Sequence, residues 1–378
     1  HKNHVCLGEM MVISRVLIMA AGTGGHVFPA LAIARQLEAR GVKVDWLGTP
    51  GGMEEKLLEG TGYEFHRIAA KGLKGKGIAR LIGAPWMLTH SFWQSLVIMR
   101  EIDPDCVLGM GGYVSGPGGV AARVLRKKLY LHEQNAVVGF TNRLLARIAT
   151  LVFEAFPGAF AESDKVVFVG NPVRADIEQV GQKLPELASP TRPLRLLVLG
   201  GSQGAKAINE TLPQALARLK ETDPNAVPEV RHQTGASQME ATQTAYTDAG
   251  FSLANRLTVT PFIDDMAAAY AWADLVIGRS GASTVAEIAV VGRASILVPY
   301  PHHRDQQQLR NARWLSVASA ATIIEQPALS GDRLASEIAA LNADRHSLLA
   351  MATAAHALAP RRVDTRIAEI MTEVADAR

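Results

Sequence analysis

The feature that most constrains the fold is a glycine-rich turn between a strand and a helix, which occurs twice in the chain. The first copy is GTGGH at positions 22–26, after the apolar run Arg15 to Ala21, and the second is GGSQG at 200–204, after Arg195 to Leu199. Apolar positions at helical spacing follow each turn, over Val27 to Leu37 and from Ala207 to Leu216. The repeat predicts one architectural unit used twice.

Short apolar runs alternate with helical patterns around each copy. We expect strands at 42–47, 106–110, 128–132 and 166–169 in the first half, and at 229–233, 256–260, 275–278 and 294–298 in the second. This alternation predicts two doubly wound, Rossmann-like α/β domains, each with a parallel sheet between helices. A length of 378 residues also exceeds what one hydrophobic core usually supports.

The predicted domain boundary lies between these halves. Asn171-Pro172 and the proline-containing stretch 182–193 interrupt the pattern, so we expect one domain over 11–171 and the other over 172–360. Ligands of open α/β sheets bind beyond the carboxyl ends of the strands, so we expect a binding cleft between the domains. A terminal amphipathic helix is expected over about 361–376.

Composition excludes several classes of protein. The chain has 39 Lys and Arg against 36 Asp and Glu, a net charge of +3, which is too small to indicate nucleic acid as a partner. Cys6 and Cys106 are too few and too far apart for a disulfide framework or a thiolate metal site, and they favour a reducing cytoplasm. No apolar run approaches eighteen residues, so we expect any membrane contact to be peripheral. Residues 1–10 are excluded from the predicted fold.

The first glycine turn is suited to a phosphate, a carboxylate or a sugar, because helix amides point out of it. It is not a dinucleotide fingerprint, since Val27 stands where glycine is required, and Lys206 after Ala205 makes the second turn no P-loop. His26 is a candidate general base, because imidazole transfers protons near neutral pH. The alternatives are a tight turn that simply needs glycine and a histidine bonded to backbone.

Two further segments of the first half follow predicted strands. A glycine cluster at 109–119 allows close approach to a polar ligand, although a mobile loop or lid before a helix at 120–125 would have the same composition. His132, Glu133, Gln134 and Asn135 come directly after another strand. Each of the four could bind hydroxyl or amide groups of a ligand, and solvation alone does not explain them.

The second half offers two comparable segments. Residues 279–287 start a helix that Ser280 could cap, with Glu287 placed to bind vicinal hydroxyls such as a ribose diol; alternatively, Glu287 is an acidic residue favoured by the helix dipole. The polar run 299–311 is suited to hydrogen-bonding a sugar.

Two segments resemble metal sites but are poor candidates. The adjacent histidines His302 and His303 cannot easily bind one ion, and Asp103-Pro104-Asp105 is better explained as a turn. We therefore expect no metal and no cofactor.

A basic and then aromatic stretch forms one more candidate surface. Lys71, Lys74, Lys76 and Arg80 lead into a helical pattern that contains Trp86, Phe92 and Trp93. Basic residues attract anionic lipid, and Trp and Phe settle at the level of the headgroups. An ordinary core-facing helix after a solvated basic loop explains the pattern equally well.

Taken together, the motifs resemble the MurG family, bacterial enzymes that add N-acetylglucosamine to a lipid-linked muramyl-pentapeptide. The resemblance covers nearly the whole chain after Met11 and rests on GTGGHVFPALAIA, GMGGYVSGPGG, HEQN, GNPVR, GGSQGA, FIDDMAAAYAWAD, SGASTVAEIA and QQLRNA. It implies a GT-B fold whose terminal helix returns to an N-terminal domain that faces the acceptor and the membrane. It also implies inverting transfer from UDP-N-acetylglucosamine to the C4 hydroxyl of lipid I at the cytoplasmic face of the inner membrane.

The resemblance also implies roles for individual residues. His26 is the candidate catalytic residue. The implied contacts with donor or sugar are Thr23, Gly24, Gly25, Asn135, Arg174, Ser202, Ile263, the helix start Ala282, Ser283, Thr284, Val285, Ala286 and Glu287, and the pair Gln307 and Gln308.

Two other functions remain open from the sequence. One is a UDP-N-acetylglucosamine 2-epimerase, which would be active without any acceptor and would need no lipid surface. The other is a non-catalytic protein that binds nucleotide sugars, which would bind without turnover.

Overall fold

The computed structural model describes residues 13–70, 78–185, 192–201, 205–254, 256–303 and 305–376, with the side chains of 78–84 and 374–376 left out. The chain divides into two units. The first unit runs to Pro172 and resumes at Arg362, and the second unit spans Val173–Arg361. No helix among the described residues is both long enough and apolar enough to span a membrane.

The first unit is built on a seven-stranded parallel sheet in the order β3-β2-β1-β4-β5-β6-β7. Its strands are β1 (Arg15–Met19), β2 (Lys43–Gly48), β3 (Glu64–Arg67), β4 (Cys106–Gly109), β5 (Lys128–Glu133), β6 (Leu151–Glu154) and β7 (Val166–Phe168). Its helices are α1 (Gly24–Glu38), α2 (Met53–Leu58), α3 (Ile78–Ile102), α4 (Ser115–Val124), α5 (Phe140–Leu145) and α14 (Val363–Asp376).

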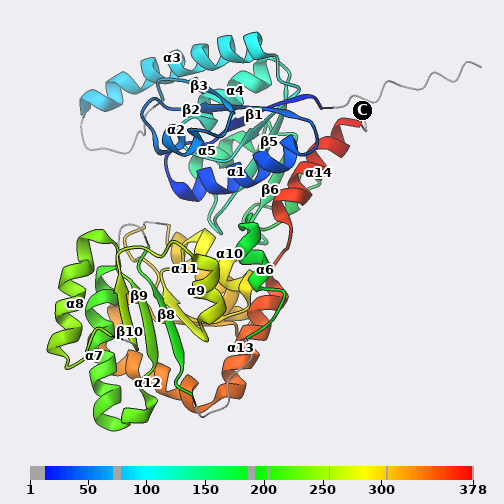
Figure 1. Cartoon of the computed structure of the whole chain (residues 1–378). Coiled ribbons are helices and arrows are strands. Elements are labelled where there is room, and N and C mark those ends of the chain that lie inside the picture. Colours follow the sequence, from blue (N-terminus) through cyan, green and yellow to red (C-terminus); the bar gives the residue numbers. More distant parts are fainter. Residues whose placement is uncertain are drawn as a thin grey trace, which may run out of the picture. The chain divides into compact units, whose positions relative to one another are not determined.

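Alternate residues of the central strand supply the two cores of the first unit. Val16 and Ile18 of β1 face α1 and α14, whereas Leu17 and Met19 face α3, α4 and α5. This follows from the pleat, which sends successive side chains to opposite faces, so a strand covered on both sides must be apolar throughout. The terminal helix α14 packs beside α1 and buries Ile367 against it (Figure 1).

The second unit repeats this plan with a six-stranded parallel sheet in the order β10-β9-β8-β11-β12-β13. Its strands are β8 (Arg195–Leu199), β9 (Glu229–Gln233), β10 (Leu257–Thr260), β11 (Leu275–Gly278), β12 (Ala294–Leu297) and β13 (Ala321–Ile323). Its helices are α6 (Ala175–Val180), α7 (Lys206–Thr222), α8 (Met239–Asp248), α9 (Met266–Trp272), α10 (Ala282–Val291), α11 (Gln307–Val317), α12 (Gly331–Ala343) and α13 (Arg345–Leu358).

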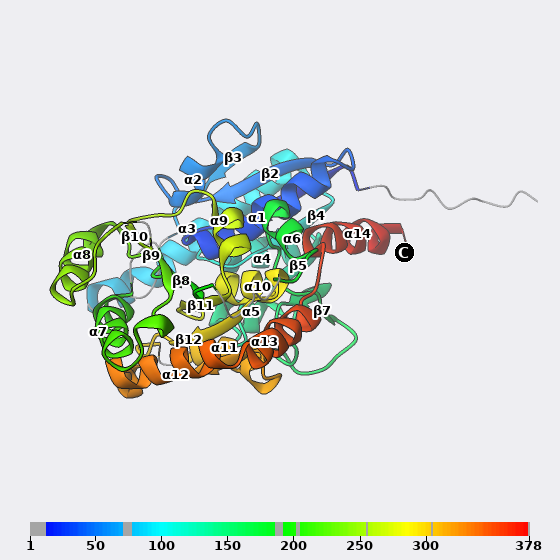
Figure 2. The same cartoon turned by 60° about the horizontal axis from the view of Figure 1, so that its bottom comes forward.

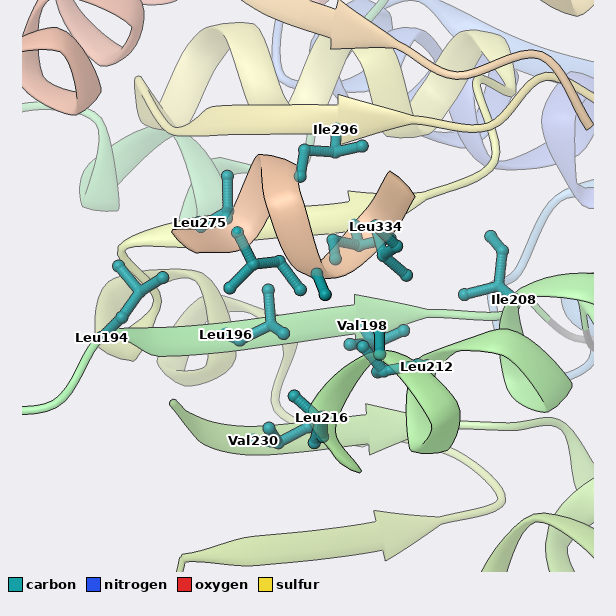
Figure 3. Packing of buried hydrophobic residues seen from close by; sticks show 14 of the residues in the cluster. Leu194, Leu196, Val198, Ile208, Leu212, Leu216, Val230, Leu275, Ile296 and Leu334 are labelled. Carbon is teal, nitrogen blue, oxygen red and sulfur yellow. The ribbon is translucent and has the colours of Figure 1, made fainter. Parts of the chain in front are cut away.

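One face of this second sheet is covered by α7 and α12, which pack side by side (Figure 2). Figure 3 shows Leu196 and Val198 of β8 pointing toward Leu212 of α7 and Leu334 of α12. Burying one leucine side chain contributes about 1.5–3 kcal/mol, so a run of such contacts is what holds the layers together. The two doubly wound parallel sheets confirm the predicted fold class.

Candidate functional site

Three loops of the first unit meet at the carboxyl edge of its sheet. Strand β1 pairs with β4, and β4 pairs with β5, so the segments that follow Met19, Gly109 and Glu133 leave the sheet side by side. These segments carry the first glycine turn, the glycine cluster and the polar run 132–135. The fold therefore brings the first glycine turn beside the polar run 132–135, which lies more than a hundred residues further along the chain.

Helix α1 begins at Gly24, three residues before the start predicted at Val27. Thr23 is its N-cap residue in extended backbone, with no side-chain capping bond, and the N–H of His26 donates to the Thr23 carbonyl at 3.0 Å. Thr23, Gly24 and Gly25 thus form the open end of the helix, where the first amides have no partner within the helix. The positive end of its dipole lies at the same place.

His26 lies in the first turn of α1, half-buried, and its ring is held from the neighbouring loops. Its Nδ1 lies 3.0 Å from Oε1 of Gln134. Gly111, at a φ of +100°, passes so close that a Cβ added there would lie 2.9 Å from the imidazole Nδ1. Only glycine tolerates both the backbone angle and this approach. The ring is therefore placed by two loops and not by backbone capping alone.

The four residues 132–135 do not all face solvent, as a ligand-binding quartet would. His132, Glu133 and Gln134 are buried and bonded within the protein, and only Asn135 is partly exposed. The carboxylate of Glu133 accepts from the Asn135 and Gly139 amides and from Nδ2 of Asn142. These bonds explain the polarity of the segment: three of its four residues build the loop that presents Asn135.

The structure also corrects the prediction of a loop over the glycine cluster 109–119. Helix α4 begins at Ser115 and not at Val120, so half of the predicted loop is helical. The Ser115 hydroxyl donates to the Gly111 carbonyl at 2.9 Å, and the Gly111 N–H donates to the Ser115 hydroxyl oxygen at 3.1 Å. A Cβ at Gly118 would meet the Met19 sulfur at 2.2 Å. Glycine is needed here because α4 packs closely against β1. The packed part of the cluster is therefore not a mobile lid.

In the second unit, the starts of α10 and α11 are tied together. The Ser280 hydroxyl donates to the Gln308 carbonyl at 2.7 Å, and Nδ2 of Asn311 donates to the Ser280 carbonyl at 3.2 Å. The predicted cap by Ser280 is therefore wrong, because the N-cap of α10 is Gly281 and the Ser280 hydroxyl is used elsewhere. The side-chain Oε1 of Gln308 accepts from the Tyr300 amide at 2.9 Å.

The predicted run 282–287 contains two kinds of residue. Ala282, Ser283 and Thr284 are at least partly exposed at the open start of α10. Val285 and Ala286 are buried, and the Val285 N–H already donates to the Gly281 carbonyl. Their side chains pack in the interior, because the helical period turns them away from the exposed residues, and their contact with a ligand stays a prediction.

Glu287 is hydrogen-bonded to Tyr270 and lies within the electrostatic influence of Arg174. The Tyr270 hydroxyl donates to Oε2 of Glu287 at 2.8 Å. Burial raises the pKa of Glu287 to about 7, while the Tyr270 hydrogen bond and the charge of Arg174 lower it. Arg174 is the N-cap of α6 and also pairs with Asp176 at 3.0 Å. The structure thus brings together Glu287 and Arg174, two of the predicted binding residues.

The remaining predicted residues are less closely connected. Ile263 lies partly buried in the loop between β10 and α9, and Gln307 is partly buried at the start of α11. Ser202 lies outside the described residues, as do Lys71, Lys74, Lys76 and Arg304.

One cluster has the geometry to hold a metal ion. The ligand atoms of Asp45, Glu64 and His66 lie within 4.8 Å of one another. However, the Arg15 guanidinium binds both carboxylate oxygens of Asp45, at 2.7 and 3.0 Å, and lowers the pKa of that carboxyl against the effect of burial. The cationic position is therefore filled by a side chain. Arg15 and Glu64 are the first residues of β1 and β3, whereas His66 is level with Leu47 of β2.

The sequence did not predict the supporting roles of three residues at these sites. Gln134 holds the His26 ring, Gly111 makes room for it, and Tyr270 holds Glu287. Gln134 had a detectable signal, since it lies two residues after His132 and so on the same face of an extended segment. Tyr270 had none, because a tyrosine in an apolar helical pattern is typical of a core position.

Comparisons with known proteins agree with this arrangement. Residues 16–154 match the glycosyltransferase family 28 N-terminal domain, and residues 195–367 match the glycosyltransferase family 28 C-terminal domain. The chain is 50% identical over 348 residues to the UDP-N-acetylglucosamine–N-acetylmuramyl-(pentapeptide) pyrophosphoryl-undecaprenol N-acetylglucosamine transferase of Chromohalobacter salexigens, covering 92% of this chain and 93% of that relative. It is 47% identical to the enzyme of the same name from Marinobacter nauticus, covering 96% and 98%.

Solved structures show the same relationship. The crystal structure of Acinetobacter baumannii MurG matches with a TM-score of 0.80 at 39% identity, covering 95% of this chain and 99% of that one. A putative UDP-N-acetylglucosamine 2-epimerase from Listeria monocytogenes matches with a TM-score of 0.67 at 14% identity, covering 96% and 97%. At that identity the likeness concerns the fold alone.

Proposed function

This chain belongs to the MurG family within glycosyltransferase family 28, and from that premise we propose the reaction that it catalyses. It transfers N-acetylglucosamine from UDP-N-acetylglucosamine to the C4 hydroxyl of lipid I, the undecaprenyl-linked muramyl-pentapeptide, with inversion at the sugar, and releases lipid II and UDP. The observation that carries this proposal in the structure is His26, an imidazole at the open start of α1 with one ring nitrogen held by Gln134.

The proposed donor site lies in the second unit. Glu287 binds the ribose diol through its carboxylate, and the amides at the start of α10 around Ala282 to Thr284 receive the diphosphate. Ser202, Arg174 and the backbone at Ile263 complete the nucleotide contacts, while Gln307 and Gln308 bind the sugar hydroxyls. Two contacts support this proposal. The Ser280 hydroxyl bonds to Gln308 and so links the starts of α10 and α11, and the Tyr270 hydroxyl bonds to Glu287.

The proposed acceptor chemistry lies in the first unit. As the acceptor oxygen bonds to C1 of the sugar, its proton passes to His26 and the bond from C1 to the UDP oxygen breaks. Negative charge then grows on UDP, where helix amides stabilise it without a metal ion. Asn135, Thr23, Gly24 and Gly25 are proposed to contact the transferred sugar or the donor.

The experiment that tests the function follows both products from UDP-N-acetylglucosamine, with and without a soluble lipid I analogue. Release of UDP that depends on the analogue and yields a disaccharide supports the transferase. Epimerisation without an acceptor would identify a 2-epimerase, and binding without turnover would identify a nucleotide-sugar-binding protein. Near-normal turnover by His26→Ala would remove His26 from the mechanism.

The proposed location is the cytoplasmic face of the inner membrane, as a peripheral protein on anionic lipid. The support is a group of exposed aromatic side chains on α3: Trp86 is 78% exposed and Trp93 is 55% exposed. Amphipathic aromatic rings settle at the headgroup level of a bilayer. Nucleic acid is not proposed as a partner.

A further inference from the structure

A chain of hydrogen bonds leads from the backbone of the first unit to the ring of His26. It begins at the Gly170 carbonyl, which lies 2.9 Å from Nε2 of His132. The other ring nitrogen, Nδ1 of His132, lies 3.1 Å from Nε2 of Gln134. The amide oxygen of Gln134 then lies 3.0 Å from Nδ1 of His26. His132 and Gln134 are both buried, so water does not compete for these bonds.

The direction of each hydrogen bond follows from groups that cannot change role. A carbonyl oxygen only accepts, so Nε2 of His132 carries the proton that it donates to Gly170. Burial lowers the pKa of His132 to about 4, which keeps the ring neutral, and a neutral ring with a protonated Nε2 has an accepting Nδ1. The amide nitrogen of Gln134 must therefore face His132.

A second carbonyl fixes the same amide independently. Nε2 of Gln134 also donates to the Met110 carbonyl at 2.8 Å. With both of its N–H groups directed to Met110 and His132, Gln134 can present only its oxygen to His26. An oxygen of a neutral amide accepts and does not donate, so Nδ1 of His26 must carry a proton.

We propose that Gln134, anchored by His132 and the Met110 carbonyl, is a positioning residue that holds His26 in the Nδ1–H tautomer and leaves Nε2 to accept the proton of the acceptor hydroxyl. The inference rests on the proposed function only for the identity of that hydroxyl. The tautomer itself is a property of the free protein. In this arrangement the hydrogen bond at one ring nitrogen decides the protonation of the other.

The choice of an amide in this position has a chemical consequence. A carboxylate beside Nδ1 would stabilise the imidazolium and raise the pKa of the ring. The neutral oxygen of Gln134 orients the ring without adding that charge. This suits a base that must begin the reaction with a free lone pair.

The first test observes the tautomer directly by nitrogen NMR of the full-length protein labelled with [15N]histidine. His26→Gln identifies the signals of His26 by their loss. At a pH where the ring is neutral, we expect a protonated-type shift at Nδ1 and an unprotonated-type shift at Nε2. A neutral ring protonated at Nε2 overturns the proposal, whatever the enzyme's activity.

The second test compares three variants by their kinetics. Gln134→Met keeps the volume but removes both hydrogen-bonding groups, and we expect kcat to fall by about 10²-fold or more, with the donor KM changed less than threefold. Gln94→Met is the matched control: the Gln94 side chain accepts from the Ala69 amide at 2.8 Å, apart from the His26 loops. We expect its kcat to stay within twofold of wild type. Equal losses in both variants would overturn a specific role.

Gln134→Glu separates positioning from mere structural support. One oxygen of its carboxyl group still accepts from Nδ1 of His26. Where the carboxyl is ionised, the acid limb of the pH profile of kcat moves to higher pH; where it keeps a proton and donates it to the Met110 carbonyl, the limb stays in place. Loss of the Nδ1–H tautomer in the folded variant contradicts the inference in either case. If the wild-type protein lacks the Nδ1–H tautomer while His26→Ala loses activity, the inference is wrong but the proposed function stands. If the wild-type protein has the tautomer while His26→Ala keeps normal activity, only the proposed catalytic step is wrong.

Discussion

The phenolic oxygen of Tyr270 lies 2.8 Å from Oε2 of Glu287, and its hydroxyl donates a hydrogen bond to that carboxylate oxygen. Burial raises the pKa of Glu287 to about 7, with Asp176 acting in the same direction. The hydrogen bond and the charge of Arg174 lower it again. The residue proposed to bind the ribose diol therefore changes its charge close to neutral pH.

This titration predicts that UDP binds more tightly as pH rises through about 7. Only the ionised carboxylate accepts hydrogen bonds from both hydroxyls of a diol, and a charge-assisted bond contributes about 1.5–3 kcal/mol. Calorimetric titration of UDP from pH 6 to pH 8 measures the effect. The reference ligand is 2′,3′-dideoxy-UDP, which carries the same phosphates without the diol. An identical pH slope for both ligands would exclude Glu287 as the cause.

The raised pKa of Glu287 also predicts that the free energy of unfolding falls as pH rises, whereas UDP binding strengthens. Because its pKa is raised above the ordinary 4.5 in the folded protein, the folded state binds the proton more tightly than the unfolded chain. A free-energy penalty therefore develops as pH rises from about 4.5 and is complete above about 7, where it reaches at most about 3 kcal/mol. Glu287→Gln should be more stable than wild type at pH 8.

Urea unfolding of the two proteins at pH 4 and pH 8 checks this stability prediction. The difference should vanish at pH 4, because Glu287 is protonated in both states there and the variant side chain keeps an oxygen for Tyr270. A stability difference that is equal at both pH values would mean that the carboxylate carries no penalty in the folded protein. The same variant should lose the pH dependence of UDP binding.

Gly111→Ala should disable the reaction more than it destabilises the fold. The new Cβ would lie 2.9 Å from Nδ1 and Cε1 of His26, so the ring must leave its position beside Gln134. Gly60→Ala is the control, since Gly60 has a φ of +80° with nothing within 4 Å of a Cβ. Backbone strain costs each variant about 1 kcal/mol.

Thermal unfolding and turnover with the lipid I analogue distinguish these two glycine variants. We expect similar losses in Tm, together with a loss of at least about 10²-fold in kcat for Gly111→Ala alone. Retained turnover in Gly111→Ala would show that the placement of the His26 ring does not limit the reaction.

The architecture could be predicted because its signals are local. Continuous apolar strands such as Arg15–Met19, glycine turns and helical spacing each occupy fewer than twenty residues, and parallel sheets follow from their alternation. The edge at which the site residues gather follows as well, since parallel strands share a carboxyl end. These rules explain why His26 and Asn135 were correctly associated with strand ends.

The supporting contacts could not be predicted in the same way. His26 and Gln134 are 108 positions apart, and nothing in either local sequence specifies that their side chains meet. Ser280 at a helix start resembles a cap, but tertiary contact with α11 takes its hydroxyl. Such bonds depend on how neighbouring loops pack, and a pattern within one segment contains no information about its neighbour. In sequence, polar residues that bind a ligand therefore look the same as polar residues that hold the loops of the site in place.

Membrane binding is expected to depend on the exposed aromatic side chains of α3. Trp86→Ser combined with Trp93→Ser removes two rings that are 78% and 55% exposed, and should lower co-sedimentation with phosphatidylglycerol vesicles by about 10-fold or more. Val317→Ser is the control, because Val317 is 85% exposed but lies at the end of α11 in the second unit.

Charge reversal tests the electrostatic part of the proposed membrane binding. Lys74→Glu with Lys76→Glu should weaken binding to anionic vesicles, because each basic residue near such a surface contributes about 1 kcal/mol. Added salt should weaken wild-type binding in the same direction, since it screens these charges, and should affect the charge-reversed variant less. Binding to neutral phosphatidylcholine vesicles should be weak in every case. Sedimentation of both the Trp variant and the Lys variant at the wild-type level would refute the proposed membrane binding.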